Sequence, residues 1–328
     1  TPGTVELESA GPLAFGPSGI LFAGDTKAAK VYALNTNDEK SGTSIAYEID
    51  DLDAKLAAKF GSDEVTVVDM VVNPETSNAF LSLTAGDNVV IARVTPGGEI
   101  SAVNLDKIPH SVATLPNPPE DKLVQRGRRS RNARNDSITD LAYTAGRVLV
   151  SGLAAGESPS AVREFDFPFN EAAAGFRVEI FHAAHGRDED YAAIRTFVPF
   201  NINGEPSLLA GYVCTPLVKF PLAGLKSEDK VRGTTVAELG NRNRPLDMIV
   251  YKKDGKDYLL LSNSARGVMK ISTENIAKNE GITSRVGGGG TAGQEYETIE
   301  SMKDVAQLDK LDDTRAVIVT QSDSGSAL

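Results

Sequence analysis

A phrase of three short apolar segments separated by turns recurs along the whole chain, and it constrains the fold more than any other feature. The phrase is first complete in Gly11–Leu34, where the expected strands are Leu13–Phe15, Ile20–Ala23 and Lys30–Leu34. Proline presets φ and glycine tolerates positive φ, so Gly16–Gly19 is expected to form the first tight turn. Apolar first strands recur at 68–72, 139–143, 195–198, 246–250 and 303–307.

The repeat predicts an all-β fold, a six-bladed β-propeller that occupies residues 1–328 as a single domain. A seventh blade would have to lie within residues 107–137, which are rich in Pro and Arg and lack a strand pattern. We therefore expect a long inter-blade insertion loop at 107–137. The last unit stops after its third strand. We expect Thr4–Ser9 to supply its outer strand and close the ring, since closure removes exposed sheet edges.

Composition excludes several classes of protein. The net charge of −11 argues against nucleic acid as a partner, and no apolar run is long enough to span a membrane. The single cysteine, Cys214, excludes an internal disulfide and any CxxC metal motif. The chain starts at Thr1 without a methionine, as a processed exported protein would. We expect a soluble, extracytoplasmic protein, either periplasmic or secreted.

All three histidines lie in segments that we expect to connect blades. In a propeller, these connections share one rim with the turns between second and third strands, so His110, His182 and His185 should project to one face. Imidazole and carboxylate form a ligand set for zinc, copper, iron and nickel. We therefore predict a transition-metal site built from His110, His182, His185 and Glu179. The alternative is that the histidines pack locally and hydrogen-bond to the backbone.

An aspartate recurs at one place in four of the expected first strands, namely Asp69, Asp140, Asp247 and Asp304. One interpretation is a ring of carboxylates at the channel mouth that holds a cation such as calcium. The other is structural: each aspartate accepts backbone N–H groups of the neighbouring blade and fixes the blade spacing. Four identical uses favour the structural interpretation.

Further polar residues on the expected rim are candidates for orienting a ligand. Asn263 and Arg266 lie in the turn after one second strand, and Arg244 precedes the inner strand of the same blade. An arginine and an amide can together orient an anionic or carbonyl-bearing ligand. Cys214 lies in the matching turn of another blade, where it is either a buried small side chain or a thiol ligand.

The first unit resembles the blade repeat of the six-bladed NHL and SMP-30/gluconolactonase-like propellers, through Gly11–Gly24 followed by Lys30–Leu34. The resemblance implies a six-bladed fold. In the lactonases it also implies a divalent ion held by an acidic residue just before the first Gly-Pro and by Asn and Asp ligands from later blades. Here Ala10 precedes Gly11-Pro12, and Glu8 is displaced by two positions. Asn263 and Asp247 are the counterparts of the later ligands.

These patterns leave three hypotheses for function. The first is an exported propeller with a metal site on one face, acting as a metal-dependent enzyme on a small molecule. The second is a non-enzymatic propeller that binds a protein or polymer, with the arginines of 126–134 docking an acidic partner. The third is a calcium-dependent, lactonase-like hydrolase.

Overall fold

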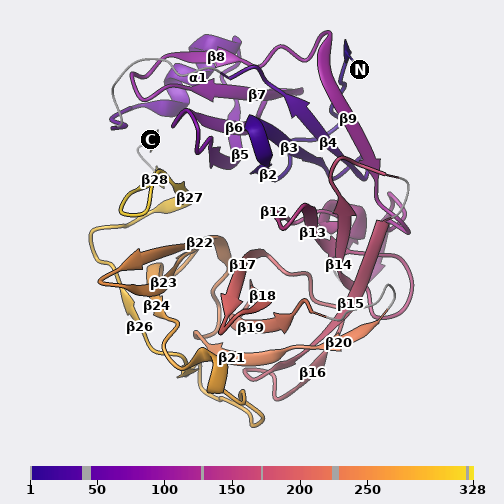
Figure 1. Ribbon diagram of the computed structural model, residues 1–328, viewed down its shortest axis with the longest axis vertical. Helices are drawn as coiled ribbons and strands as arrows, with labels where there is room; N and C mark the ends of the chain where they lie inside the picture. The colour runs from indigo at the N-terminus through magenta and orange to yellow at the C-terminus, as the bar shows by residue number, and fades with distance from the viewer. Residues whose placement is uncertain (1, 39–45, 127–128, 171–172, 224–228, 323–324) are drawn as a thin grey trace.

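The sheets of the molecule are arranged in a ring, and six of them are blades (Figure 1). The computed structural model describes residues 2–38, 46–126, 129–170, 173–223, 229–322 and 325–328. The predicted all-β, six-bladed propeller is confirmed. Within the described residues, no helix has the length and apolarity that crossing a membrane requires.

Each blade is named here by its innermost strand, and its strands are given from the channel outwards. The β2 blade contains β2 (Leu13–Phe15), β3 (Ile20–Asp25), β4 (Lys30–Asn35), β9 (Ile108–Thr114) and β1 (Pro2–Gly3). The β5 blade contains β5 (Val65–Val72), β6 (Ala79–Ala85), β7 (Asn88–Val94) and β8 (Ile100–Ala102). The β12 blade contains β12 (Asp140–Thr144), β13 (Arg147–Leu153), β14 (Ser160–Asp166), β15 (Ala173–His182) and β16 (Arg187–Glu189), with β20 (Lys230–Arg232) pairing parallel to β15.

The second half of the chain forms the other three blades. The β17 blade contains β17 (Thr196–Ile202), β18 (Glu205–Gly211), β19 (Pro216–Pro221), β21 (Thr234–Glu238) and β25 (Ala292–Gly293). The β22 blade contains β22 (Pro245–Lys253), β23 (Lys256–Asn263), β24 (Gly267–Ser272) and β26 (Tyr296–Thr298). The β27 blade contains β27 (Val305–Lys310), β28 (Ala316–Ser322) and β29 (Gly325–Ala327). Among the described residues, the helical elements are α1 (Leu52–Phe60) and three short 3₁₀ turns, η1 (Pro17–Gly19), η2 (Ala133–Asp136) and η3 (Ile276–Lys278).

The blades do not follow one another around the ring in chain order. The β5 blade is inserted between the third and fourth strands of the β2 blade, because β9 returns to pair with β4. The β5 blade consequently packs between the β27 and β2 blades, and the β2 blade packs on the β12 blade. Around the ring the order is β27, β5, β2, β12, β17, β22 and back to β27.

Hydrophobic packing between blades holds the ring together. Six apolar clusters lie one at each blade junction. The middle strands are therefore buried on both faces, as in β6, where six of seven residues are buried. This explains why second strands appear in the sequence as continuous apolar runs rather than as alternating patterns.

The prediction that Thr4–Ser9 completes the last blade is wrong. The N-terminal strand β1 pairs with β9 on the outer edge of the β2 blade, and the N–H of Val5 donates to the carbonyl of Leu105. The edge of the β27 blade is covered instead by the segment before α1. There, Ile49 and Leu328 exchange two backbone hydrogen bonds of 2.8 and 3.0 Å. An earlier part of the chain therefore does cover the last blade, but it is the segment around Ile49 and not Thr4–Ser9.

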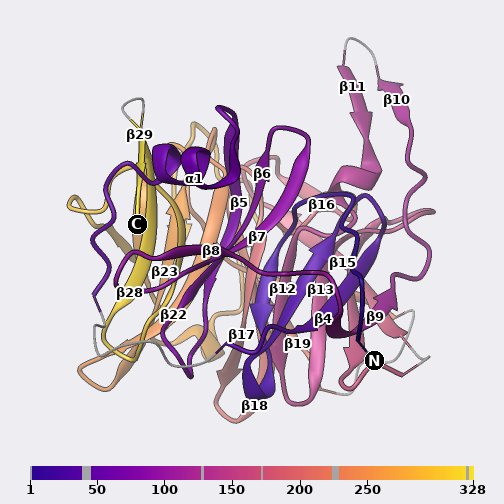
Figure 2. The same ribbon diagram turned by 90° about the horizontal axis from the view of Figure 1, so that it is seen from above.

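The segment 107–137 is not the irregular loop that its prolines and arginines predict. Its first part is β9, and a second part forms the hairpin of β10 (Leu123–Arg126) and β11 (Arg129–Asn132). Figure 2 shows this hairpin standing out from one face of the ring. Proline disfavours a central strand, but Pro109 lies opposite Pro2 near the outer edge of its sheet, where it is tolerated.

Candidate functional site

Three aspartates with a shared geometry line the channel. Asp69, Asp140 and Asp247 lie on β5, β12 and β22, which are alternate blades of the ring. Each is paired with a serine of the second strand: Ser82, Ser151 and Ser262 respectively. In β5 and β22, a β-bulge directly precedes the aspartate, and bulges commonly re-aim a side chain.

Each of these carboxylates accepts a backbone hydrogen bond from the next blade around the ring. The donors are Leu13 N to Asp69 at 2.6 Å, Phe197 N to Asp140 at 2.7 Å and Leu308 N to Asp247 at 2.8 Å. The second oxygens of Asp140 and Asp247 accept the N–H of the following residue, both at 2.7 Å. This is the bonding that the structural interpretation of the aspartates describes.

Asp304 does not join this set. It is exposed, has a φ of +57° and precedes β27. The fourth carboxylate that bonds across a junction is Asp309, which accepts the N–H of Val72 at 2.7 Å. Asp309 lies opposite Val317 rather than a serine, so it is at a different register from the other three. The prediction of Asp304 is therefore wrong, because the pattern of Asp followed by an apolar residue does not fix the register of this blade.

Burial raises the pKa values of the channel carboxyls. The pKa of Asp140 rises to about 7 and that of Asp309 to about 6, mainly through burial. The pKa values of Asp69 and Asp247 lie well above the ordinary range because of burial and of repulsion between the aspartates. Among the described residues, these carboxylates do not form a group of three with ligand atoms within 4.8 Å of one another. The geometry therefore gives no support to calcium at this ring.

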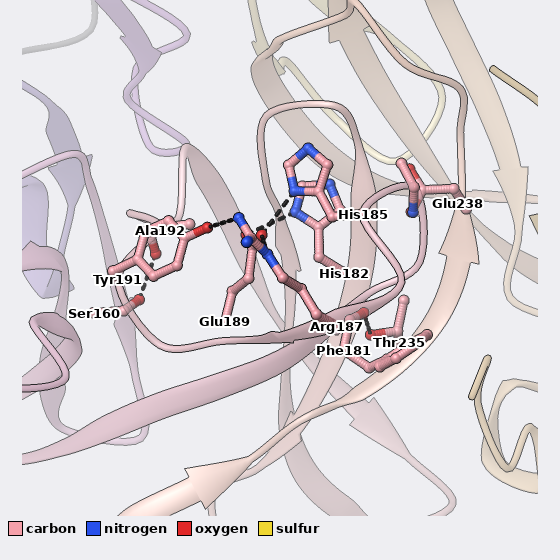
Figure 3. A network of polar contacts seen from close by, with 11 residues as sticks. Ser160, Phe181, His182, His185, Arg187, Glu189, Tyr191, Ala192, Thr235 and Glu238 are labelled. Atoms are coloured by element: carbon pink, nitrogen blue, oxygen red, sulfur yellow. Dashed lines mark hydrogen bonds and ion pairs between the residues drawn. The ribbon is translucent and has the colours of Figure 1, made fainter. Parts of the chain in front are cut away.

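A separate cluster on the outside of the β12 blade contains His182, His185 and Glu189. The hairpin of β15 and β16 brings them together, because His182 pairs with Arg187 and so shares its face with Glu189. The Nδ1 atom of His182 lies 2.9 Å from Glu189 Oε2, and the Nδ1 atom of His185 lies 2.7 Å from Oε1. The centres of the two rings are 3.8 Å apart (Figure 3).

The carboxylate of Glu189 orients both rings. Burial alone would raise the pKa of Glu189, but hydrogen bonds with His182, His185 and Tyr191 outweigh it and lower the pKa to about 2. Arg187 adds a 3.1 Å contact to the same carboxylate. An ionised carboxylate only accepts hydrogen bonds, so each Nδ1 atom donates its proton to Glu189. Burial lowers the pKa of His182, which favours its neutral form with a lone pair on Nε2. His182 is 3% exposed, and its Nε2 has no partner in the described structure.

The other two predicted members of the metal site lie elsewhere. Glu179 is on the opposite face of β15 from His182, because side chains alternate along a strand, and it is paired with Lys230 at 2.8 Å. His110 is in β9 of the β2 blade, where its Nδ1 contacts the carbonyl of Ile108 at 3.0 Å. His110 is not among the described groups whose ligand atoms lie within 4.8 Å. The prediction of one site with three histidines and Glu179 is therefore wrong.

The four residues predicted to orient a ligand, Cys214, Arg244, Asn263 and Arg266, do not form one site in the structure. Asn263 is buried, and its side-chain oxygen accepts from Asn243 at 3.0 Å, so it braces a turn. Arg266 lies against Gly240, and Cys214 occupies a strained turn with a φ of +72°. Arg244 alone of the four lines the cavity at the channel mouth, which has a volume of about 650 Å³.

The metal site was predicted with Glu179 in place of Glu189, and Arg195, which lines the same cavity as Arg244, was not predicted from the sequence. Glu189 did have a signal: a tight turn at Gly186 would place residues 187–189 opposite 180–182. Arg195 had no comparable signal, because its place next to Arg244 depends on the packing of the β17 and β22 blades.

No protein-family model and no curated protein matches the chain. Solved structures that resemble it include Kuenenia stuttgartiensis hydrazine synthase, with 10% identity, a TM-score of 0.44 and coverage of 98% of this chain and 98% of that chain. Streptogramin B lyase has 10% identity, a TM-score of 0.39 and coverage of 97% and 93%. The PQQ-bound aldose sugar dehydrogenase from Streptomyces coelicolor has 10% identity, a TM-score of 0.33 and coverage of 98% and 90%. Such likeness concerns the fold alone. The arrangement of the sheets makes this chain a six-bladed β-propeller, and membership of the NHL or SMP-30 families stays a prediction.

Proposed function

We propose that the protein is a metal-binding β-propeller in which the Nε2 atoms of His182 and His185 bind a divalent transition-metal ion. The observation that carries the proposal is the buried Nε2 of His182, a lone pair without a partner in the described structure. The two rings are in contact and tilted by 36°, and because their Nδ1 atoms converge on Glu189, their Nε2 atoms lie on the ring edges away from that carboxylate. Metal-binding histidines commonly donate the other ring N–H to a carboxylate in this way.

Imidazole pairs select ions such as copper, nickel and zinc. An ion with two protein ligands retains positions for water or for a small molecule, which a metal-dependent reaction requires. If the protein is a metal-dependent enzyme, we propose that its reaction takes place at the hairpin of β15 and β16. A calcium-dependent lactonase would need a different site.

The test is titration of the purified, metal-free protein with Zn²⁺, Ni²⁺ and Cu²⁺, followed by metal analysis. We expect one tight equivalent of at least one ion in the wild type. His185→Ala should abolish it without unfolding the protein, because the His185 side chain is 43% exposed. Glu189→Gln keeps the two ligands but removes the charge behind them, so binding should weaken about 10- to 100-fold.

His110→Ala is the matched control, because it removes the third histidine from a blade that does not contribute to the cluster. This variant should bind metal as the wild type does. The proposal fails if the wild type binds none of the three ions, or if His110→Ala loses as much metal as His185→Ala.

A second function is favoured by the hairpin of β10 and β11. Leu123 and Val124 are 74% and 43% exposed, on a hairpin that stands out from one face of the ring (Figure 2). An isolated two-stranded hairpin is marginally stable in water, so a protein partner that covers it would stabilise it. Arg131 lies opposite Val124 on the paired strand and would attract negative charge, so the partner we propose is an acidic protein segment. A fluorescent poly-glutamate peptide should bind the wild type more tightly than a Leu123→Ser, Val124→Ser variant with the same fold, and equal binding would dismiss this function.

A further inference from the structure

The mouth of the channel next to the hairpin is a cavity of about 650 Å³, within the usual range of small-molecule sites. Every blade contributes to its wall through its innermost strand or the residue just before it. These contributors are Pro12, Asp69, Asp140, Thr196, Asp247 and Gln307. Asp121 and Asn132, at the base of the β10–β11 hairpin, also line it. The cavity is therefore built by the whole ring and does not depend on one loop.

One side of the cavity is positively charged. Arg195 and Arg244 precede the neighbouring strands β17 and β22 and both line the wall. Arg195 contacts Asp136 at 2.7 Å, and Asp136 is also held by Arg131 at 2.6 Å. No ion pair joins Arg244 to a carboxylate in the part of the chain that the structure describes. Arg195 and Arg244 thus bring two guanidinium groups to this wall, and Asp136, the carboxylate that pairs with Arg195, is shared with Arg131.

Arg244 lines the cavity and is placed to bind an anion. Arg244 is exposed at the wall, and its pKa is lowered by partial burial of the guanidinium group and by the neighbouring Arg195 and raised by Asp136, so the two guanidinium groups lie close enough to repel each other. A bound oxyanion between them would relieve that repulsion. Guanidinium groups bind carboxylates and phosphates through two parallel hydrogen bonds, so either anion fits this wall.

The three channel aspartates favour a different kind of ligand group from the one that the arginines favour. Asp69, Asp140 and Asp247 line the cavity on alternate blades, and each already accepts a backbone N–H of the next blade. Carboxyl oxygens can accept further hydrogen bonds on their remaining lone pairs. In their ionised form these carboxyls would repel an anionic group, and in either form their oxygens would accept hydrogen bonds from hydroxyl groups. The cavity therefore distinguishes the two ends of a ligand.

We infer that the channel mouth binds a small hydroxylated organic anion, with its carboxylate or phosphate on Arg244 and Arg195 and its hydroxyl groups toward the three aspartates. The site is independent of the histidine cluster, which lies at the outer edge of the β12 blade.

Calorimetric titration of the full chain with four probes tests the inference. Glycerate and glycerol 3-phosphate carry both features, inorganic phosphate carries only the charge, and glycerol carries only the hydroxyl groups. We expect at least one of the first two to bind more tightly than inorganic phosphate, and glycerol not to bind. The tighter of the two anions shows whether the site prefers a carboxylate or a phosphate.

Arg244→Gln should weaken binding of the preferred anion about tenfold or more, since it removes a charge-assisted hydrogen bond. The matched control is Arg242→Gln, two residues away, exposed and outside the cavity lining, which should bind as the wild type does. Asp247→Asn should reduce the advantage of the hydroxylated anion over inorganic phosphate. The inference is overturned if neither anion binds at about 10 mM, if Arg244→Gln binds like the wild type, or if Arg242→Gln loses as much as Arg244→Gln.

Discussion

Replacing Asp140 by Asn removes one titrating group from the channel while nearly preserving its shape. The pKa of Asp140 is raised by burial to about 7, against 3.8 for an unperturbed aspartate. The folded protein therefore holds this proton more tightly than the unfolded chain does. Between pH 4 and pH 7, stability should fall as pH rises, and this single group contributes about 4 kcal/mol across that window.

The asparagine side chain of this variant does not titrate, but it has one acceptor oxygen where the carboxylate has two. Either Phe197 N or Leu141 N, each 2.7 Å from an Asp140 oxygen, loses its partner. Losing an acceptor costs about 1–3 kcal/mol, so Asp140→Asn should be less stable than the wild type at pH 5. At pH 8 the wild type has the additional cost of a buried charge, so the difference should shrink and can reverse.

Urea unfolding at pH 5, 6.5 and 8 measures this difference directly. For a chain of this length, about 4 kcal/mol corresponds to a shift in Tm of about 6 °C, which thermal unfolding resolves. Asp254→Asn, at an exposed turn, is the control and should follow the wild type at every pH. Parallel stability curves for Asp140→Asn and the wild type would show that Asp140 is not protonated near neutral pH, and the argument for a raised pKa would be refuted.

Three further predictions concern the fold. Phe22→Ala should reduce the free energy of unfolding by about 3–5 kcal/mol, because Phe22 is fully buried between two blades; denaturant titration measures it. Deleting residues 325–328 removes β29 and both bonds to Ile49, so it should lower Tm more than deleting residues 1–3, and equal losses would contradict the proposed closure. Gly293→Ala should destabilise the β17 blade by about 2 kcal/mol or more, since its φ is +86° and a Cβ would lie 2.1 Å from the carbonyl oxygen of Val236; an unchanged Tm would contradict this.

The blade count could be predicted from the sequence because each blade repeats the same three buried strands. The ring order could not, because it depends on β9 returning to β4 after a whole blade has intervened. The sequence of β9, Ile108–Thr114, alternates poorly and contains Pro109, so a local pattern could not identify it as a fourth strand. The segment that covers the last blade could not be identified for the same reason: Ile49 and Leu328 are far apart in the chain. The expectation of export stays a prediction.

The candidate sites show what a repeat can and cannot predict about chemistry. Asp69, Asp140 and Asp247 could be predicted because they recur within the blade, and recurrence led correctly to a shared backbone contact. The histidine cluster occurs once, so only strand geometry could assemble it. Residues three apart in a strand point to opposite faces, which excludes Glu179, whereas a tight turn at Gly186 returns Glu189 to the face of His182.

The position of a strand within its blade determines which kind of site it can form. Inner strands converge, so the mouth of the channel combines residues of all six blades and can surround a small molecule. Outer strands diverge, so β15 and β16 have to build their cluster within one hairpin. An ion on the outer hairpin is therefore too remote to act on a ligand in the channel mouth. Removing metal should leave anion binding unchanged, and Arg244→Gln should leave metal binding unchanged. Any coupling between the two titrations would require a change in the packing of the β12 and β17 blades, which share one apolar cluster.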